Sequence, residues 1–539
     1  MLLPGCGNQT VYSSPTPPPS TPPPTSPPPL GPPAATVYVD CSAATNGNGS
    51  QSSPWNTLAM ISTTTFNPGD QILFNRGTTC SGVLAPLGSG TTASPIVIDA
   101  YGTGPQPIID GGMNTTAVGL YGVEGYEINN LEIVGGNQYG IYIVGTAPNT
   151  TYTHYRLTNL NVHGAHYVST ANSDSDEILI AIGNEGENFD DIVLDGVSAH
   201  DSAVFNGIEI DVGTPFNTNP PVFGNNVTIQ NSTVYNIYGI GMTMFAVTNG
   251  LMQNNVVHNS GQCPTNPGCG GTTGGMMDLY CHTCTIQNNE VYSVQDWSPW
   301  DGGDYDIDVW NTNNIVQYNY GHDSVGYCVS VFSAYMEVST NEIIRYNVCA
   351  NNSQLVNSPD SGEIFMNTNG ASVSGTLDGI EVYNNTFYWN PATPGPAFDT
   401  VDADFSGAGP NLFENNIIYS TVPNLIETTT DFTLNNNIYW TVGTTPDWNI
   451  NGADYANLAS YQSASSQDAN SLYTDPMMNT PTYHGVGLPV AEFTLLPGSP
   501  AIGAGANICS GISGCSMGTQ DFWGNPLPNG TGYNIGAWQ

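Results

Sequence analysis

The chain has 539 residues, of which only 9% are charged, and its formal net charge is −41. It has no lysine, and its only arginines are Arg76, Arg156 and Arg345. Nucleic acids and anionic membrane surfaces are bound through clustered Lys and Arg, so we expect neither as a partner. Because 39% of the residues are hydrophobic, most of the chain should fold despite its charge.

Residues 1–35 are expected to form a tether. The segment Leu3-Pro4-Gly5-Cys6 resembles a bacterial lipobox, in which the cysteine is lipidated, although the basic and apolar regions that normally precede it are missing. Either the start is truncated or the match is accidental. Residues 13–33 are almost wholly Pro, Ser and Thr, a composition typical of an extended spacer. We therefore predict an extracellular or cell-surface protein, with lipidation of Cys6 as its only means of contacting a membrane.

Two elements are predicted directly after this tether. Residues 52–66 (SSPWNTLAMISTTTF) suit a short amphipathic helix, and residues 69–77 (GDQILFNRG) suit a strand. A repetitive domain needs its open ends covered, so the helix is expected to be an N-terminal cap.

One short pattern, apolar-x-Asn-x-x-apolar, recurs from residue 128 to residue 439. Its third position is occupied by Asn130, Asn159, Gly196, Asn231, Asn254, Asn288, Tyr318, Tyr346, Asn384, Asn415 and Asn436. A second segment of alternating apolar and polar residues follows most copies, which is the period of a strand with one buried face. The Leu spacing and the helix of a leucine-rich repeat are absent. The pattern predicts an all-β, parallel β-helix over residues 36–470, in which Asn side chains pair between coils.

Residues 471–539 leave the pattern and are expected to form an irregular C-terminal cap. Two motifs resemble bacterial secreted proteins of the pectin-lyase-like superfamily: VYVDCSAATNGNGSQSSPWNTL near the start, and GSPAIGAG with DFWGNPLPNGTGYNIGAW near the end. Leu527 and Asn534 depart from the closing motif, where a basic residue and an Asp are usual. The resemblance implies a single-stranded right-handed parallel β-helix, a scaffold that carries lyases, hydrolases, epimerases and binding proteins.

Ten of the eleven cysteines fall into pairs, and Cys6 is left over. The simplest pairing joins Cys41 with Cys80, Cys263 with Cys269, Cys281 with Cys284, Cys328 with Cys349, and Cys509 with Cys515. Disulfides imply an oxidising compartment. Cys281-His-Thr-Cys284 could instead be a redox or zinc motif, but no second CxxC accompanies it, so a structural role is favoured.

The candidate catalytic residues come from aligning the second segments by their inward apolar residues. This alignment places in one outward column the residues Glu209, Thr243, Asp278, Asp308 and Ser330. Asp278 and Asp308 would then be neighbours on adjacent coils, about 4.8 Å apart, with Asp306 one outward position away. Two close carboxyl groups suit a glycosidase, because one stays protonated while the other is ionised. We predict that Asp278, Asp306 and Asp308 cleave a glycan.

Side chains near this column are predicted to bind the substrate: Glu209, Tyr280, Trp297, Trp300, Trp310, His322 and Arg345. The aromatic rings would offer platforms for sugar rings. Two other interpretations of the acidic residues stay open. One is a calcium site that includes Asp301 and Asp304, because that cation prefers carboxylate oxygens. The other is a solvated face without a function.

The leading hypothesis is a monomeric carbohydrate-active enzyme that hydrolyses a neutral or weakly acidic polysaccharide and requires no cofactor. A non-catalytic adhesin, structural or glycan-binding surface protein is the first alternative. A calcium-dependent polysaccharide lyase is the second, although family lyases use Lys or Arg as the base and only Arg345 lies in the central coils. The Gly-His-Gly and Arg-Ile-Lys motifs of polygalacturonases are also missing from the sequence.

Overall fold

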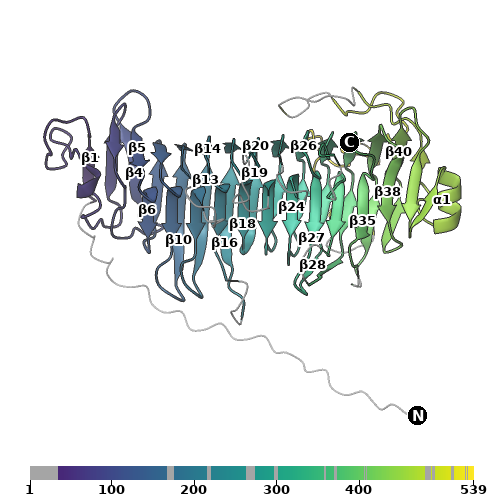
Figure 1. Ribbon diagram of the computed structural model, residues 1–539, viewed down its shortest axis with the longest axis horizontal. Coiled ribbons are helices and arrows are strands. Elements are labelled where there is room, and N and C mark those ends of the chain that lie inside the picture. The colour runs from purple at the N-terminus through teal and green to yellow at the C-terminus, as the bar shows by residue number, and fades with distance from the viewer. Residues whose placement is uncertain are drawn as a thin grey trace, which may run out of the picture. The chain divides into compact units, whose positions relative to one another are not determined.

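The computed structural model describes residues 34–166, 175–214, 220–262, 273–295, 301–356, 360–369, 373–405, 407, 409–479, 487, 492–510, 515–528, 530 and 532–539. The chain divides into two units, Met1–Ala34 and Ala35–Gln539. Cys6 and the predicted spacer lie outside the described residues. The second unit is a solenoid, in which the chain passes through three parallel sheets in turn (Figure 1).

Each of the three sheets takes one strand from each successive coil. Sheet 1 contains β1 (Thr36–Val39), β2 (Gln71–Asn75), β4 (Ile96–Tyr101), β7 (Tyr126–Asn129), β10 (Thr151–Thr158), β13 (Asn188–Asp195), β16 (Gly224–Gln230), β19 (Val247–Gln253), β22 (Thr285–Gln287), β25 (Ile315–Gln317), β29 (Ile343–Arg345), β33 (Glu381–Tyr383), β36 (Asn411–Glu414) and β39 (Phe432–Asn435). Sheet 2 contains β3 (Thr79–Ser81), β5 (Ile108–Gly112), β8 (Glu132–Gly135), β11 (Asn161–His163), β14 (Ser198–His200), β17 (Thr233–Tyr235), β20 (Val256–His258), β23 (Glu290–Tyr292), β26 (Tyr320–His322), β30 (Val348–Ala350), β34 (Thr386–Trp389), β37 (Ile417–Ser420), β40 (Ile438–Thr441) and β43 (Leu472–Tyr473).

Sheet 3 positions the candidate site. It contains β6 (Thr116–Tyr121), β9 (Tyr139–Val144), β12 (Asp176–Ala181), β15 (Asn206–Asp211), β18 (Ile240–Phe245), β21 (Gly274–Leu279), β24 (Gly303–Asp308), β27 (Val329–Phe332), β31 (Ile364–Asn367), β35 (Phe398–Asp402), β38 (Asn424–Thr428), β41 (Asp447–Ile450) and β42 (Ala453–Tyr455). A separate two-stranded sheet is formed by β28 (Val338–Thr340) and β32 (Thr376–Asp378). The parallel β-helix predicted from the repeat is confirmed.

The core is built from side chains that point into the solenoid at the same position of successive strands. In sheet 2 such a column consists of Val162, Ala199, Val234, Val257 and Val291, all fully buried. Each coil therefore buries its apolar residues against the coils before and after it. This explains why the sequence repeats an apolar pattern without a long apolar run.

Two asparagine columns run along the turn between sheets 1 and 2. The column predicted from the sequence has a left-handed backbone, with φ of 55° at both Asn254 and Asn288, a conformation that Asn tolerates better than most residues. The continuous hydrogen-bond ladder belongs to the next residue of the chain. The N–H of Asn255 donates to Oδ1 of Asn289 (2.9 Å), whose own N–H donates to Oδ1 of Asn319 (3.0 Å). These buried amides hold successive coils in register.

The ends of the solenoid are closed differently from the prediction. The helix expected over residues 52–66 is reduced to the three-residue 3-10 helix η1 (Leu58–Met60), whereas β2 forms where a strand was predicted. The far end carries helix α1 (Leu458–Ser465) (Figure 1). Its Tyr461 stacks on Trp448, with the ring centroids 6.0 Å apart. Within the described residues, no helix has the length and apolar character needed to span a bilayer.

The C-terminal segment after β43 is irregular in its described part, as predicted, and it returns along the turn between sheets 1 and 2. Nδ2 of Asn384 donates to the carbonyl of Asn534, and Nδ2 of Asn415 donates to the carbonyl of Ala506, both at 2.9 Å. The segment therefore covers the side of the last coils, using the outer asparagine column as its attachment.

Three of the predicted disulfides are present: Cys41 with Cys80, Cys328 with Cys349, and Cys509 with Cys515. The predicted bond between Cys281 and Cys284 is wrong, because both are free, buried thiols. Each Sγ lies 3.5 Å from a carbonyl oxygen of the preceding coil, on Met244 and Val247 respectively. The two thiols thus occupy inward positions of a turn.

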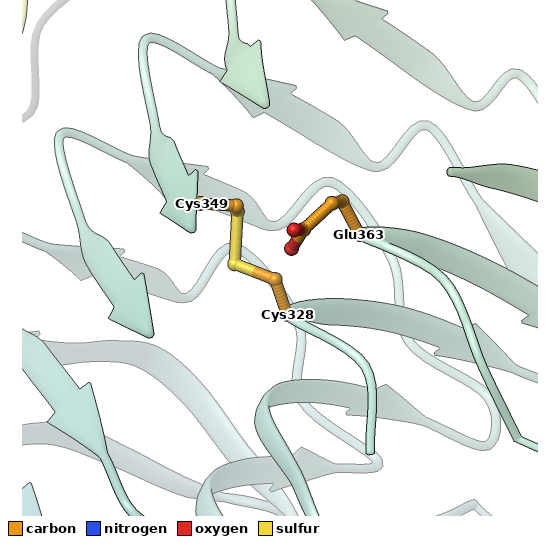
Figure 2. Close-up of side chains that lie close together, drawn as sticks. All are labelled: Cys328, Cys349 and Glu363. Atoms are coloured by element: carbon orange, nitrogen blue, oxygen red, sulfur yellow. A yellow bond between two sulfur atoms is a disulfide. The ribbon is translucent and has the colours of Figure 1, made fainter. Parts of the chain in front are cut away.

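Figure 2 shows the Cys328–Cys349 disulfide beside the carboxylate of Glu363. The three side chains lie within 4.8 Å of one another, which is the spacing of a metal site. Sulfur binds metals as a thiolate, and both of these sulfur atoms are in a disulfide. The group is therefore structural. The remaining predicted pair, Cys263 and Cys269, lies outside the described residues.

Candidate active site

The outward face of sheet 3 carries the predicted acidic residues, but in a different register. β21 and β24 pair so that Met277 lies beside Asp306, and Asp278 lies beside Ile307. The outward column consists of Glu209, Thr243, Met277, Asp306, Ser330 and Phe365.

Asp278 points into the solenoid. It shares its column with Met244 and Ile307, and only 1% of its surface is exposed. Burial, together with the charge of Asp306, raises the pKa of Asp278 well above its ordinary value. The prediction that Asp278 is an outward catalytic neighbour of Asp308 is therefore wrong, since a slip of one residue in register reverses the face of a side chain.

Asp278 is already inward relative to β18, where Thr243 lies beside Met277, and an additional turn residue separates the register of the strands from that of the turns between β21 and β24. One residue with a left-handed backbone, Tyr280, follows β21, whereas two such residues, Val309 and Trp310, follow β24. Beyond the turn, the N–H of Cys281 donates to Oδ1 of Asn311 (2.7 Å). The stacked turn residues are thus one residue further apart in sequence than the paired strand residues. An alignment that suits the turns gives the wrong face in the strands.

Asp306 is an outward carboxyl group that is almost fully buried, with 4% of its surface exposed. The Ser330 hydroxyl donates to its Oδ1, and the Tyr327 hydroxyl donates to its Oδ2 at 3.1 Å. Burial raises the pKa of Asp306 to about 6, and these two hydrogen bonds oppose a larger rise because they stabilise the ionised form. Asp306 therefore ionises close to neutral pH.

Asp308 lies two residues after Asp306, so it points to the same side of β24. Its side chain is partly exposed. Burial raises the pKa of Asp308 well above the ordinary value, and the charges of Asp306 and Asp278 add to the rise. The strand thus presents two neighbouring carboxyl groups whose pKa values are both raised, which suits one of them to hold a proton while the other is ionised, as acid–base hydrolysis requires.

Aromatic side chains flank this carboxyl pair. Tyr280 and Trp310 occupy the turns after β21 and β24, with ring centroids 6.1 Å apart in an edge-to-face arrangement. Phe223 and His282 lie 6.0 Å and 5.7 Å from the Trp310 ring. Tyr280 is buried, whereas Trp310 is partly exposed and offers apolar surface beside the site.

Comparisons with known proteins identify the fold. No family model and no curated protein matches the chain. Among solved structures, the GH136 lacto-N-biosidase from Eubacterium ramulus matches with 19% identity and a TM-score of 0.51, over 64% of this chain and 67% of that one. The pectate lyase Pel9A matches over 94% of this chain and 96% of that one, with 14% identity and a TM-score of 0.40. The chain has the pectin-lyase-like fold.

In this pectin-lyase-like fold the three sheets face different directions, which separates some of the predicted substrate-binding residues. Glu209 lies in the outward column of sheet 3, whereas His322 lies on sheet 2 and is 1% exposed. The ring nitrogens of His322 pair with Asp323 (2.8 Å) and Glu290 (3.3 Å). Burial alone would lower the pKa of His322, but these two carboxylates raise it. The expected place of His322 beside the acidic cluster is therefore wrong.

Arg345 is likewise remote from the carboxyl pair, because it lies on sheet 1. Its Nε donates to Gln317 (2.8 Å), and its Nη1 donates to the Tyr383 hydroxyl (3.0 Å) and to the carbonyl of Ser516 (2.6 Å). Only 7% of the residue is exposed. Arg345 fastens the returning C-terminal segment to sheet 1, and the prediction that it binds substrate is wrong.

The predicted calcium pair is not assembled. Asp304 points inward, is fully buried and accepts a hydrogen bond from the Ser324 hydroxyl (2.5 Å). Burial raises the pKa of Asp304 well above its ordinary value. Asp301 donates its backbone N–H to Asp360 (3.0 Å) instead. Among the described residues, Asp301 and Asp304 form no common ligand group, and the predicted pair is not formed because the Asp304 side chain is buried against Ser324.

Two residues that hold Asp306 were not assigned from the sequence. Ser330 stands in the predicted outward column, so the repeat could have indicated it. Tyr327 precedes β27 and has no counterpart in the repeat, and only the tertiary contact reveals it. The predicted platforms Trp297 and Trp300 lie outside the described residues.

Proposed function

We propose that this protein is a glycoside hydrolase that acts on a neutral or weakly acidic polysaccharide at the outward face of sheet 3. The observation that carries the proposal is the pair Asp306 and Asp308, which share one face of one strand, have raised pKa values and differ in hydrogen bonding. The likeness to a solved lacto-N-biosidase supports an activity on carbohydrates.

In this mechanism Asp308 is the general acid. It donates its proton to the glycosidic oxygen as the bond from that oxygen to the anomeric carbon breaks. Asp306, as the carboxylate, either takes a proton from the attacking water or attacks the anomeric carbon itself. The first route inverts the anomeric configuration and the second retains it, so the product of the first turnover distinguishes them.

The distribution of positive charge favours an uncharged substrate. Arg156 lies on β10 and pairs with Asp191, Arg345 lies on β29, and Arg76 directly follows β2, so all three belong to sheet 1 or its edge. A uronate carboxylate bound on sheet 3 would meet aspartates without a neutralising cation. A lyase needs such a cation to stabilise the carboxylate during proton abstraction.

The test is incubation of the full chain with a panel of plant and microbial polysaccharides, followed by analysis of the products. New reducing ends without unsaturation support the proposal, and products with an unsaturated uronate would instead indicate a lyase. Asp308→Asn and Asp306→Asn should each lower kcat by about 10²-fold or more. Asp431→Asn, at an exposed position before β39, is the matched control and should keep full activity. Retention of activity in Asp308→Asn would refute the assignment.

We further propose that the protein works outside the cell or at its surface and needs no metal for catalysis. The three disulfides support the location, because such bonds persist in oxidising compartments. Activity should be unchanged by EDTA. If Cys6 is lipidated, the wild type should fractionate with membranes and Cys6→Ala should not. Recovery of both proteins in the membrane-free fraction would contradict the lipid anchor.

A further inference from the structure

A recess lies on the outward face of sheet 3, between β9, β12 and β15. Its volume is about 190 Å³, and its lining includes Tyr139, Tyr142, Leu179, Glu209 and Asp211. The strands are in register so that Tyr142, Leu179 and Glu209 occupy one outward column. This is the column that continues to Asp306.

One wall of the recess is aromatic. The rings of Tyr139 and Tyr142 are stacked, with centroids 4.4 Å apart and planes inclined by 16°. The ring of Tyr121 meets Tyr142 edge-on at 6.1 Å, and Tyr121 is 45% exposed. Tyr139 and Leu179 are themselves buried, so the partly exposed Tyr142 and the neighbouring Tyr121 supply the aromatic surface on which the C–H face of a pyranose can pack.

The opposite wall carries two carboxyl groups, one of which, Glu209, also accepts a hydrogen bond from Nδ2 of Asn206. Glu209 and Asp211 lie two residues apart on β15 and point to the same side of the strand. Ionised carboxylates accept hydrogen bonds and donate none, so they suit sugar hydroxyl groups. Arg156 is engaged with Asp191 on sheet 1, and an anionic sugar would meet only like charge. The recess therefore suits an uncharged pyranose.

The outward column also contains a hydroxyl group, between the recess and Asp306, that is unpartnered among the described residues. Thr243 follows Glu209 in the outward column and is 5% exposed, yet its hydroxyl has no hydrogen-bond partner within the described part of the chain. A buried hydroxyl without a partner costs about 1–3 kcal/mol.

We infer that the recess is a distal subsite, which holds one neutral pyranose of the glycan that is cleaved at Asp306 and Asp308. Glu209 and Asp306 are separated by three coil steps, through Thr243 and Met277, or about 14 Å at about 4.8 Å per step. One pyranose residue of an extended glycan spans about the same distance as one coil step. The inference rests on the proposed function for the position of the cut, but not for sugar binding itself.

Sugar binding is tested on the full chain carrying Asp308→Asn, so that nothing is hydrolysed. The probes are galactose, N-acetylglucosamine and galacturonate, measured by saturation-transfer NMR and calorimetry. At least one neutral sugar should bind. Tyr142→Ala should weaken it about 10-fold or more, whereas Tyr142→Phe, which keeps the ring, should bind normally. Tyr101→Ala, on sheet 1, is the matched control.

Glu209→Gln keeps the shape of the recess and provides a second variant if Tyr142→Ala is unstable. It should weaken neutral sugars about 10-fold, because an amide replaces a charged acceptor. Binding of galacturonate as tightly as the neutral sugars, or neutral binding unaffected by both variants, overturns the subsite. If sugars bind as expected but no polysaccharide is cleaved, the subsite stands and the hydrolase proposal fails.

Discussion

Raising the pH should destabilise this protein from its interior, because carboxyl groups are buried inside the solenoid without cations. Glu177 accepts hydrogen bonds from the Ala165 N–H (2.9 Å) and the Ser202 hydroxyl, and it is fully buried. Glu363 accepts from Nδ2 of Asn352 (3.1 Å) and is also fully buried. Burial raises the pKa of each of these two carboxyl groups to about 8.

The sign of the effect follows from the proton balance. The unfolded chain releases these protons near pH 4.3, whereas the folded chain keeps them up to about pH 8. Between these values the folded state binds more protons, so its stability falls as the pH rises. The stabilisation is fully present below the unfolded pKa and is lost as the pH approaches the folded pKa. In this window each of the two groups lowers the free energy of unfolding by about 1.4 kcal/mol per pH unit, or by about 3 kcal/mol from pH 5.5 to 7.5.

The perturbation is Glu177→Gln, which removes the titrating group and keeps an oxygen to accept the two hydrogen bonds. Urea unfolding is followed by tryptophan fluorescence at pH 4.5, 5.5, 6.5 and 7.5. The difference in unfolding free energy between the variant and the wild type should move in favour of the variant by about 3 kcal/mol from pH 5.5 to 7.5. Glu363→Gln should behave in the same way.

Glu185→Gln is the matched control, since it removes a carboxylate from an exposed position of the next turn. Its unfolding curves should follow the wild type at every pH. Parallel pH dependence of the wild type, Glu177→Gln and Glu363→Gln would refute the reasoning, because it would mean that these carboxyl groups are ionised in the folded protein.

Three further predictions concern the carboxyl pair, the asparagine ladder and the free thiols. Tyr327→Phe removes one hydrogen bond to the Asp306 carboxylate, so it should raise the pKa of Asp306 by about 0.5–1 unit. The acidic limb of the kcat/KM profile should move to higher pH by the same amount, and an unshifted profile contradicts the assignment. Asn289→Ala leaves buried backbone groups without partners and should lower the free energy of unfolding by about 2–4 kcal/mol. Asn288→Gly, at the neighbouring left-handed position, should change the free energy of unfolding by less than about 1 kcal/mol. Equal losses in the two variants would disprove the inner ladder. The unfolded, unreduced wild type should contain two more reactive thiols than the Cys281→Ser, Cys284→Ser double variant, and an equal thiol count would show that the two sulfurs are bonded.

The sequence by itself determined the solenoid. A parallel β-helix repeats its apolar positions in every coil, and the left-handed turn residue favours Asn, as at Asn254 and Asn288. Both signals are local, so they survive variable loops. The three disulfides found in the structure were also predictable, because the solenoid allows bonds between cysteines that are close in sequence or on adjacent coils.

The tertiary structure decided which acidic residues face outward. The segment that contains Asp278 has apolar residues of both parities, so its pattern suits either face of β21. The pairing of Thr243 with Met277 sets Asp278 inward. In β24, the inward Tyr305, whose hydroxyl donates to the carbonyls of Asn289 and Tyr320, sets Asp306 outward. These contacts join residues from different coils. They place Asp306 outward and Asp278 inside, and the repeat pattern alone does not distinguish the two positions.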